Sequence, residues 1–183
     1  DGENSVVYTE NAEDLAEIVS YADVLYLTNN KPIPAQTRAA IMQRVNEGKL
    51  AMMISHPGTW YNWADWPAYN KELVGGGSRS HEPLGEFEVE VVKPDHRIMK
   101  GVPQKFKIVD ELYRWEPDSS ATPIEVLAIG RSLTTGKEYP AVWIVKHPKT
   151  KIVGNTLGHD ERAHGLPAYK TILKNSIDWI KYE

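Results

Sequence analysis

The sequence predicts an α/β fold with a mostly parallel sheet, because apolar strand-like runs alternate with helical segments. Val24–Thr28 and Leu50–Ser55 are short, continuous apolar runs, of the kind that is buried on both faces of a parallel sheet. Between them a helical pattern begins at Pro34 and stops at Gly48. This strand–helix–strand order is typical of doubly wound sheets.

Weaker patterns flank this unit. Ser5–Tyr8 is a short apolar run that predicts a strand, and Asn11 indicates the start of a helix after it. Near the other end, Ala141–Val145 and Lys151–Thr156 flank a turn and predict an antiparallel hairpin. An apolar stripe predicts a final helix from about Pro167.

The middle of the chain predicts strands of two kinds. Gly85–Val92 alternates Phe and Val with Glu, which indicates a half-exposed strand, antiparallel or at an edge. Ile124–Gly130 is a continuous apolar run that predicts a buried strand. No repeat or linker interrupts the pattern, so we expect residues 1–183 to form one α/β domain.

Charge and composition exclude several classes of function. The net charge is −4 and no run of Lys and Arg occurs, which argues against nucleic-acid binding. No apolar stretch approaches the ~20 residues of a membrane span, so we expect a soluble protein, either cytoplasmic or periplasmic and exported. The absence of cysteine excludes disulfides, thiolate metal sites and a cysteine nucleophile.

Ser55 and His56 directly follow a predicted strand, where a doubly wound sheet places its ligands. A serine nucleophile at Ser55 is disfavoured, because Met53 and Pro57 occupy the glycine positions of a Gly-x-Ser-x-Gly elbow. We therefore expect His56, rather than Ser55, to contribute a polar contact at the strand end.

Aromatic residues recur every third position in the segment Trp60, Trp63, Trp66 and Tyr69. Flat rings with a polar atom can stack on sugar faces while they bond hydroxyl groups, which makes Trp60, Trp63 and Tyr69 candidate sugar ligands. The same pattern also fits a segment that only packs its rings onto the sheet. The sequence leaves both interpretations open.

Three histidines, His56, His81 and His159, lie on predicted loops that can converge at one end of the sheet. Neutral imidazoles are ligands for Zn²⁺ or another divalent metal, and Asp160 can add an oxygen ligand or hold a ligating histidine. Their spacing resembles no zinc motif closely, so a polar pocket without metal is the alternative.

A carboxylate pair, Asp110 and Glu111, precedes Tyr113. Neighbouring side chains point in different directions, so these two alone do not form an acid–base pair. Glu111 can instead act with a histidine from another segment. Helix capping or an ion pair is the structural alternative.

The chain resembles the ThuA-like (trehalose utilisation) family through several motifs in a shared order. They are Trp66-Pro67-x-Tyr69-Asn70, Leu73-Val74-Gly75-Gly76, Gly101-Val102-Pro103, Asp110-Glu111-x-Tyr113, Pro140-x-x-Trp143 and Thr156-Leu157-Gly158-His159-Asp160. The resemblance implies a flavodoxin-like three-layer sandwich, related to the class I glutamine amidotransferases. Those enzymes use a cysteine where this chain has Ser55–His56, so glutaminase activity is excluded. Such chains also open with a strand and helix that this one does not match.

The resemblance implies a role in the use of trehalose or a related disaccharide. We expect a sugar pocket lined by His56, Trp60, Trp63, Tyr69, His81, Glu111, Tyr113, His159 and Asp160. In an enzyme, His159 or Glu111 acts as general base, while His81 orients a hydroxyl or binds a metal together with His56 and His159.

Two other classes of function remain open. One is a non-catalytic interaction module, which predicts histidines that do not converge and buried Trp side chains. The other is a metal-dependent hydrolase of another small polar substrate. The partners we expect are small carbohydrates and a second copy of the chain.

Overall fold

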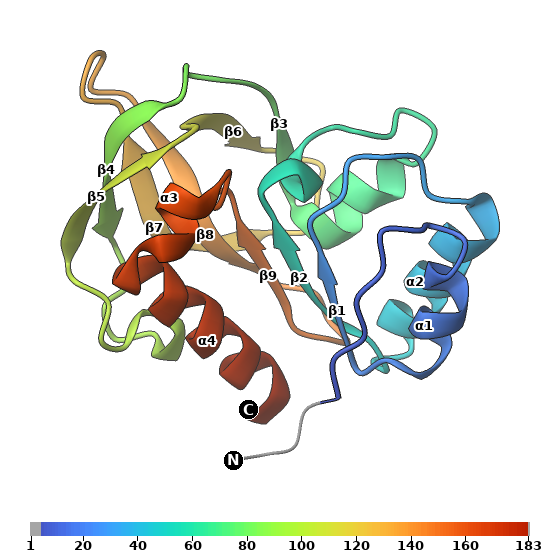
Figure 1. Cartoon of the computed structure of the whole chain (residues 1–183). Helices are drawn as coiled ribbons and strands as arrows, with labels where there is room; N and C mark the ends of the chain where they lie inside the picture. The colour runs from blue at the N-terminus through green and yellow to red at the C-terminus, as the bar shows by residue number, and fades with distance from the viewer. Residues whose placement is uncertain (1–4, 183) are drawn as a thin grey trace.

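The computed structural model describes residues 5–182, which form a curved seven-stranded sheet and a small two-stranded sheet (Figure 1). The strand order in the large sheet is β1-β2-β9-β8-β7-β4-β5. The α/β class is therefore confirmed.

Three strands at one side of the large sheet are parallel. They are β1 (Val24–Leu27), β2 (Ala51–Ser55) and β9 (Ile152–Asn155). Helix α1 (Leu15–Tyr21) precedes β1, and α2 (Ala35–Asn46) connects β1 to β2. The strand–helix–strand unit predicted around Pro34 is therefore confirmed.

The other side of the sheet is antiparallel. It consists of β8 (Glu138–Val145), β7 (Ile124–Arg131), β4 (Gly85–Val91) and β5 (Lys105–Asp110). The predicted hairpin is present as β8 and β9. The sheet is thus mixed rather than mostly parallel, because hairpins return the chain without a crossover helix through its middle. The finer flavodoxin-like, three-layer description stays a prediction.

The small sheet pairs β3 (Gly76–His81) with β6 (Tyr113–Pro117). A helical segment that begins at Pro67 and becomes a π-helix over Tyr69–Val74 leads into β3. Glu111 lies on the link between β5 and β6, where the chain passes from the large sheet to the small one.

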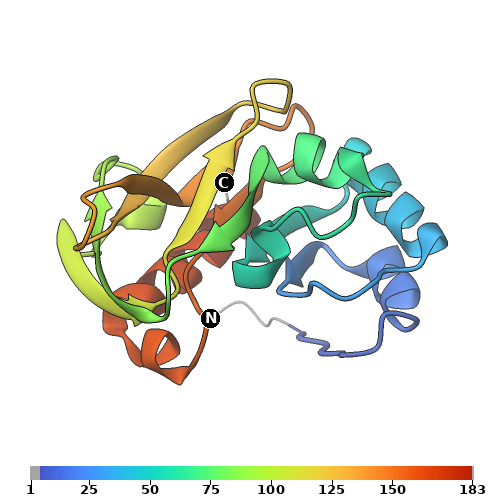
Figure 2. The same cartoon turned by 90° about the horizontal axis from the view of Figure 1, so that it is seen from above.

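Two apolar cores lie on opposite faces of the large sheet, because successive residues of a strand point to opposite faces. Met52 packs with α1 and α2 in one core, and Met53 packs with α4 (Pro167–Tyr182) in the other. Figure 2 shows α1 and α2 on one side of the molecule and α4 on the other. The short helices His56–Thr59, Arg97–Met99 and α3 (Glu161–Gly165) complete the fold.

The strand predicted at Ser5–Tyr8 does not form. These residues are irregular, and Val6 and Tyr8 are 85% and 78% exposed, so no apolar surface holds the run in the sheet. Strand β1 consequently lies at the edge of the sheet. Within residues 5–182, no helix is both long and apolar enough to cross a membrane.

Candidate functional site

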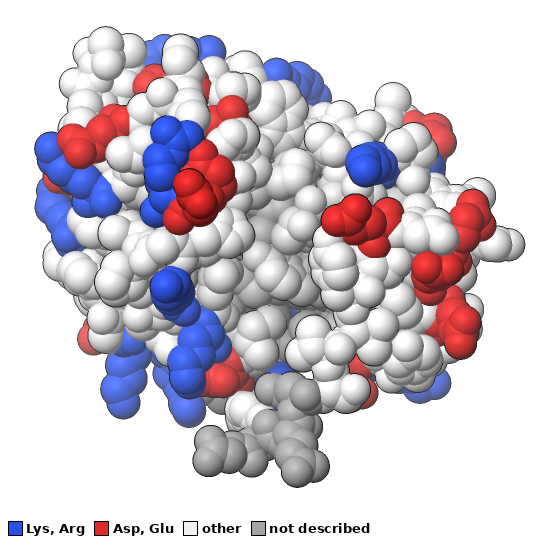
Figure 3. Space-filling model, viewed as in Figure 1, with Lys and Arg blue, Asp and Glu red and all other residues white. Residues whose placement is uncertain are grey.

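A cavity of about 570 Å³ lies at the carboxyl ends of the three parallel strands. This is the place where open α/β sheets bind ligands, and the size suits a small molecule. Figure 3 shows this face of the molecule hollowed between its two halves, with charged groups mostly on the flanks. The lining residues are Tyr26, Thr28, Asn30, Ser55, His56, Pro57, Trp60, Asn62, Glu111, Tyr113, Gly158, His159, His164 and Tyr169.

His56 occupies the sharp turn that follows β2. Its φ of 46° lies in the left-handed region, which is strained for a residue with a side chain and is often found at functional sites. Its Nδ1 lies 2.9 Å from the carbonyl oxygen of Thr156, so Nδ1–H donates and Nε2 carries the lone pair. Burial lowers the pKa of His56 and favours this neutral form.

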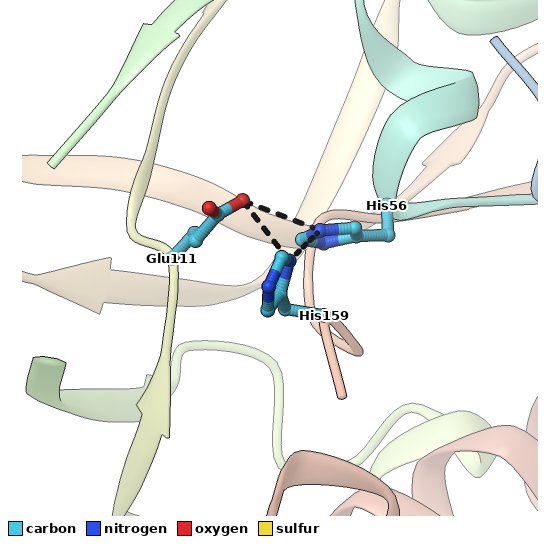
Figure 4. A group of neighbouring side chains, drawn as sticks. All are labelled: His56, Glu111 and His159. Atoms are coloured by element: carbon cyan, nitrogen blue, oxygen red, sulfur yellow. Dashed lines mark hydrogen bonds and ion pairs between the residues drawn. The ribbon is translucent and has the colours of Figure 1, made fainter. Parts of the chain in front are cut away.

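The side chains of His56, Glu111 and His159 converge in the cavity (Figure 4). The Nε2 atom of His56 lies 3.2 Å from Nδ1 of His159 and 3.5 Å from Oε2 of Glu111. The third distance, from His159 Nδ1 to Glu111 Oε2, is 3.3 Å. The three atoms come from three separate loops, as the sequence predicted for strand ends.

Asp110 connects two of these loops through hydrogen bonds to their backbone. Its buried carboxylate accepts N–H bonds from Gly158 at 2.7 Å, from His159 at 3.1 Å and from Glu111 at 2.8 Å. A buried carboxylate with three charge-assisted hydrogen bonds is a rigid anchor. Asp110 therefore positions the backbone that carries both Glu111 and His159, a role that sequence reasoning missed.

Aromatic rings line the wall beside the cluster. Tyr113 packs on His56 with ring centroids 4.6 Å apart, and Trp60 meets Tyr113 at 5.3 Å with perpendicular planes. Burial raises the pKa of the Tyr113 hydroxyl, which keeps it a hydrogen-bond donor. Trp60 and Tyr113, both predicted from the sequence as substrate-binding residues, thus line the cavity.

His81 contacts Glu111 but is not a member of the cluster. Its Nδ1 is 2.8 Å from the carbonyl oxygen of Glu82 and 3.7 Å from Oε1 of Glu111. The group of side chains that can share one cation is His56, Glu111 and His159, so Glu111 takes the place predicted for His81.

Trp63 and Tyr69, predicted to bind sugar, do not line the cavity. Both pack with Trp66 in the core, and the Tyr69 hydroxyl donates to the carbonyl of Gly58. Tyr69 belongs to the helical segment, and Trp63 lies in the loop before it and donates its Nε1–H to the carbonyl of Lys31, whereas Trp60 stays at the cavity. The segment therefore contains both a packing cluster and one cavity residue.

Asp160 is also placed differently from the prediction. Its side chain caps α3 and pairs with Arg162, whose hydrogen bonds lower the pKa of Asp160 to about 2. It is absent from the lining of the cavity among the described residues. The Asp160 carboxylate bonds its own helix rather than the cavity, because α3 begins directly after this residue.

Several lining residues were not predicted from the sequence. Tyr26 lies in β1, Thr28 and Asn30 follow it, and Tyr169 comes from the first turn of α4. Their position at the end of a predicted strand was the available signal for the first three. Ser55 also lines the cavity, and its buried hydroxyl has no hydrogen-bond partner.

Comparison with solved structures supports the fold. Putative ThuA-like proteins from Bacteroides uniformis ATCC 8492 and Parabacteroides merdae ATCC 43184 are 22% and 20% identical to the chain, with TM-scores of 0.75 and 0.77. The matches cover 94% and 96% of this chain, and 75% and 77% of theirs. A putative GMP synthase protein from Thermoplasma acidophilum, 16% identical, has a TM-score of 0.55 over 90% of this chain and 75% of its own.

At the sequence level no curated protein matches the chain. The family described as ThuA, trehalose utilisation, matches residues 2–180, which is nearly the whole chain. Together with the shared fold of the ThuA-like structures, this match confirms the resemblance carried by the motifs. The chain therefore belongs to the ThuA family.

Proposed function

We propose that this protein binds and processes a carbohydrate, trehalose or a related disaccharide, in the cavity at the ends of β1, β2 and β9. The observation that carries the proposal is the convergence of His56, Glu111 and His159 beside Trp60. The family description supports a role in trehalose utilisation.

The cavity contains the groups that such chemistry needs. Trp60 offers a partly exposed ring face for stacking on a sugar, and its neighbour Tyr113 offers a hydroxyl. Glu111 or His159 acts as general base on a sugar hydroxyl or a water molecule. Because the chain has no cysteine, this chemistry is not that of a cysteine-dependent glutaminase.

The convergence of the histidines argues against the non-catalytic interaction module, which predicts that they stay apart. The burial of Trp63 and Trp66 fits that alternative, but Trp60 does not share it. A hydrolase of another small polar substrate uses the same residues, and the choice between the two substrates depends on the ligand experiment below.

The test is a thermal-shift screen of the protein against a panel of disaccharides, with and without added Zn²⁺. A sugar at a hundred times its dissociation constant stabilises the native state by about 2.7 kcal/mol. We expect stabilisation by trehalose or a related disaccharide, and its loss in Trp60→Ala. His159→Ala is expected to lose turnover, whereas the control His147→Ala, in the β8–β9 turn, keeps both. No response to any sugar would contradict the proposal.

A further inference from the structure

We propose that His56 Nε2, His159 Nδ1 and Glu111 Oε2 form a three-ligand site for a divalent transition metal, with Zn²⁺ as the probe. The inference rests on the proposed function in one respect: it assigns a cofactor to the same cavity. It differs from the sequence-based set of three histidines, because Glu111 replaces His81.

The spacing of the three atoms is that of zinc ligands. They lie 3.2, 3.3 and 3.5 Å apart. Ligand atoms about 2.0–2.1 Å from a tetrahedral zinc are about 3.3 Å from one another. The three distances are thus compatible with one ion bound by all three atoms.

The chemistry of the cluster also calls for a cation. The Nε2 atom of His56 carries a lone pair, because its Nδ1–H is used by Thr156. The same Nε2 atom lies 3.5 Å from an oxygen of Glu111, so an imidazole nitrogen and a carboxylate oxygen are presented to one point. Both are ligand atoms that a divalent transition metal binds.

Hydrogen bonds from neighbouring residues orient the three proposed ligands. Metal-binding histidines usually donate their other N–H to a carbonyl or carboxylate, as His56 does to Thr156. Asp110 fixes the backbone of both other ligands. On the far side of Glu111, His81 lies 3.7 Å from the oxygen that the cluster does not use.

The fourth position is open to the cavity. The side chains of His56, Glu111 and His159 are 10%, 17% and 39% exposed, so the cluster opens from the protein interior toward solvent. Ser55 adds a buried hydroxyl without a partner at the same cavity, which is a group available to a bound ligand. Three protein ligands and one open position are typical of catalytic rather than structural zinc.

Such a site supplies the proposed sugar chemistry with a Lewis acid. A bound divalent ion can orient a sugar hydroxyl or lower the pKa of a bound water. The substrates that suit it are small polyols and sugars, whose oxygen atoms can reach the open position.

The experiment is a titration of tag-free, metal-stripped protein with Zn²⁺, followed by calorimetry, and with Co²⁺, followed by visible absorption. We expect one ion per chain, a rise in melting temperature and the strong absorption of tetrahedral Co²⁺. Glu111→Gln keeps the shape of the side chain and is expected to weaken Zn²⁺ binding at least ~10-fold. The matched control His147→Ala is expected to bind as the wild type does.

The outcomes separate this inference from the proposed function. No binding, or equal Zn²⁺ affinity in wild type and Glu111→Gln, would overturn the metal site. A disaccharide that binds equally well with and without metal would overturn the assignment of the ion to the sugar chemistry, while it leaves the sugar proposal intact. Conversely, metal binding that depends on Glu111 with no response to any sugar supports the site and contradicts the carbohydrate function. Circular dichroism of Glu111→Gln excludes unfolding as the cause of a loss.

Discussion

The carboxylates on the β4–β5 strand pair and the carboxylate directly after it have different partners. On the β4–β5 surface, Glu88 lies 3.3 Å from Lys105, and Glu90 lies 3.0 Å from Lys105 and 3.1 Å from Arg131. Glu111, one residue beyond β5, instead faces histidines at 3.3 to 3.7 Å. The alternation of side chains along the strand places Glu88 and Glu90 beside surface cations. Glu111 faces the histidines instead, because the chain turns out of the sheet after β5.

The difference shows which acidic side chains are available for chemistry. The strand glutamates are neutralised by permanent cations, so their charge is used for pairing at the surface. Glu111 is surrounded by imidazoles, which carry no fixed charge, and its carboxylate remains available to a proton or a metal ion. The following changes test this distinction.

The largest effect is expected from Asp110→Asn. The amide keeps the size of the side chain but loses the charge that three backbone N–H groups share. We expect the free energy of unfolding to fall by about 1–3 kcal/mol, as measured in urea, and Zn²⁺ affinity to fall ~10–100-fold. The control Asp178→Asn changes an exposed pair on α4 and is expected to alter neither quantity. Unchanged stability and unchanged affinity in Asp110→Asn would remove Asp110 from the site.

An intermediate effect is expected from His81→Lys, which gives Glu111 the kind of partner that the strand glutamates have. The ammonium group competes with the metal for the carboxylate, and a partly exposed pair is worth up to about 1 kcal/mol. Calorimetry should therefore show a loss of Zn²⁺ affinity of up to ~5-fold. His81→Gln removes the ring without adding charge and serves as the control. If both variants bind Zn²⁺ equally, the charge next to Glu111 is irrelevant to the site.

The smallest effect is expected from Glu90→Gln on the strand surface. Hydrogen bonding from Lys105 lowers the pKa of Glu90 below its usual value of 4.5, so the pair stabilises the fold at neutral pH. That stabilisation is lost as the pH falls through the lowered pKa. We expect a slightly lower melting temperature than wild type at neutral pH and low salt, with the difference vanishing in acid or high salt. Zn²⁺ binding should not change, and a large change there would contradict the separation of the two groups.

Several elements could be predicted from the sequence because their signals are local. The strand–helix–strand unit before Ser55, the hairpin at β8 and β9, and helix α4 each follow from hydrophobic periodicity within a few residues. The alternation in Gly85–Val92 predicted a strand that is antiparallel or at an edge, and β4 is antiparallel to both neighbours while β5 forms the edge.

The composition of the candidate site could be predicted only in part from local sequence patterns. A rule about strand ends was sufficient to predict that His56, Glu111 and His159 are functional candidates. The same rule gave no reason to prefer Glu111 over His81 as the third member of the cluster. Nor did it distinguish Trp60 from Trp63, because both belong to one periodic pattern.

The sequence by itself determined the residue types of the site, the absence of a cysteine nucleophile and the parallel strands that carry His56. The tertiary structure alone decided which of these side chains meet. Glu111 reaches the two histidines only because β5 ends beside the loop after β9, where Asp110 bonds both segments. Such contacts join residues about 50 and 100 positions apart, and strand order and packing create them, whereas a hydrophobic pattern reports only on the nearest few residues.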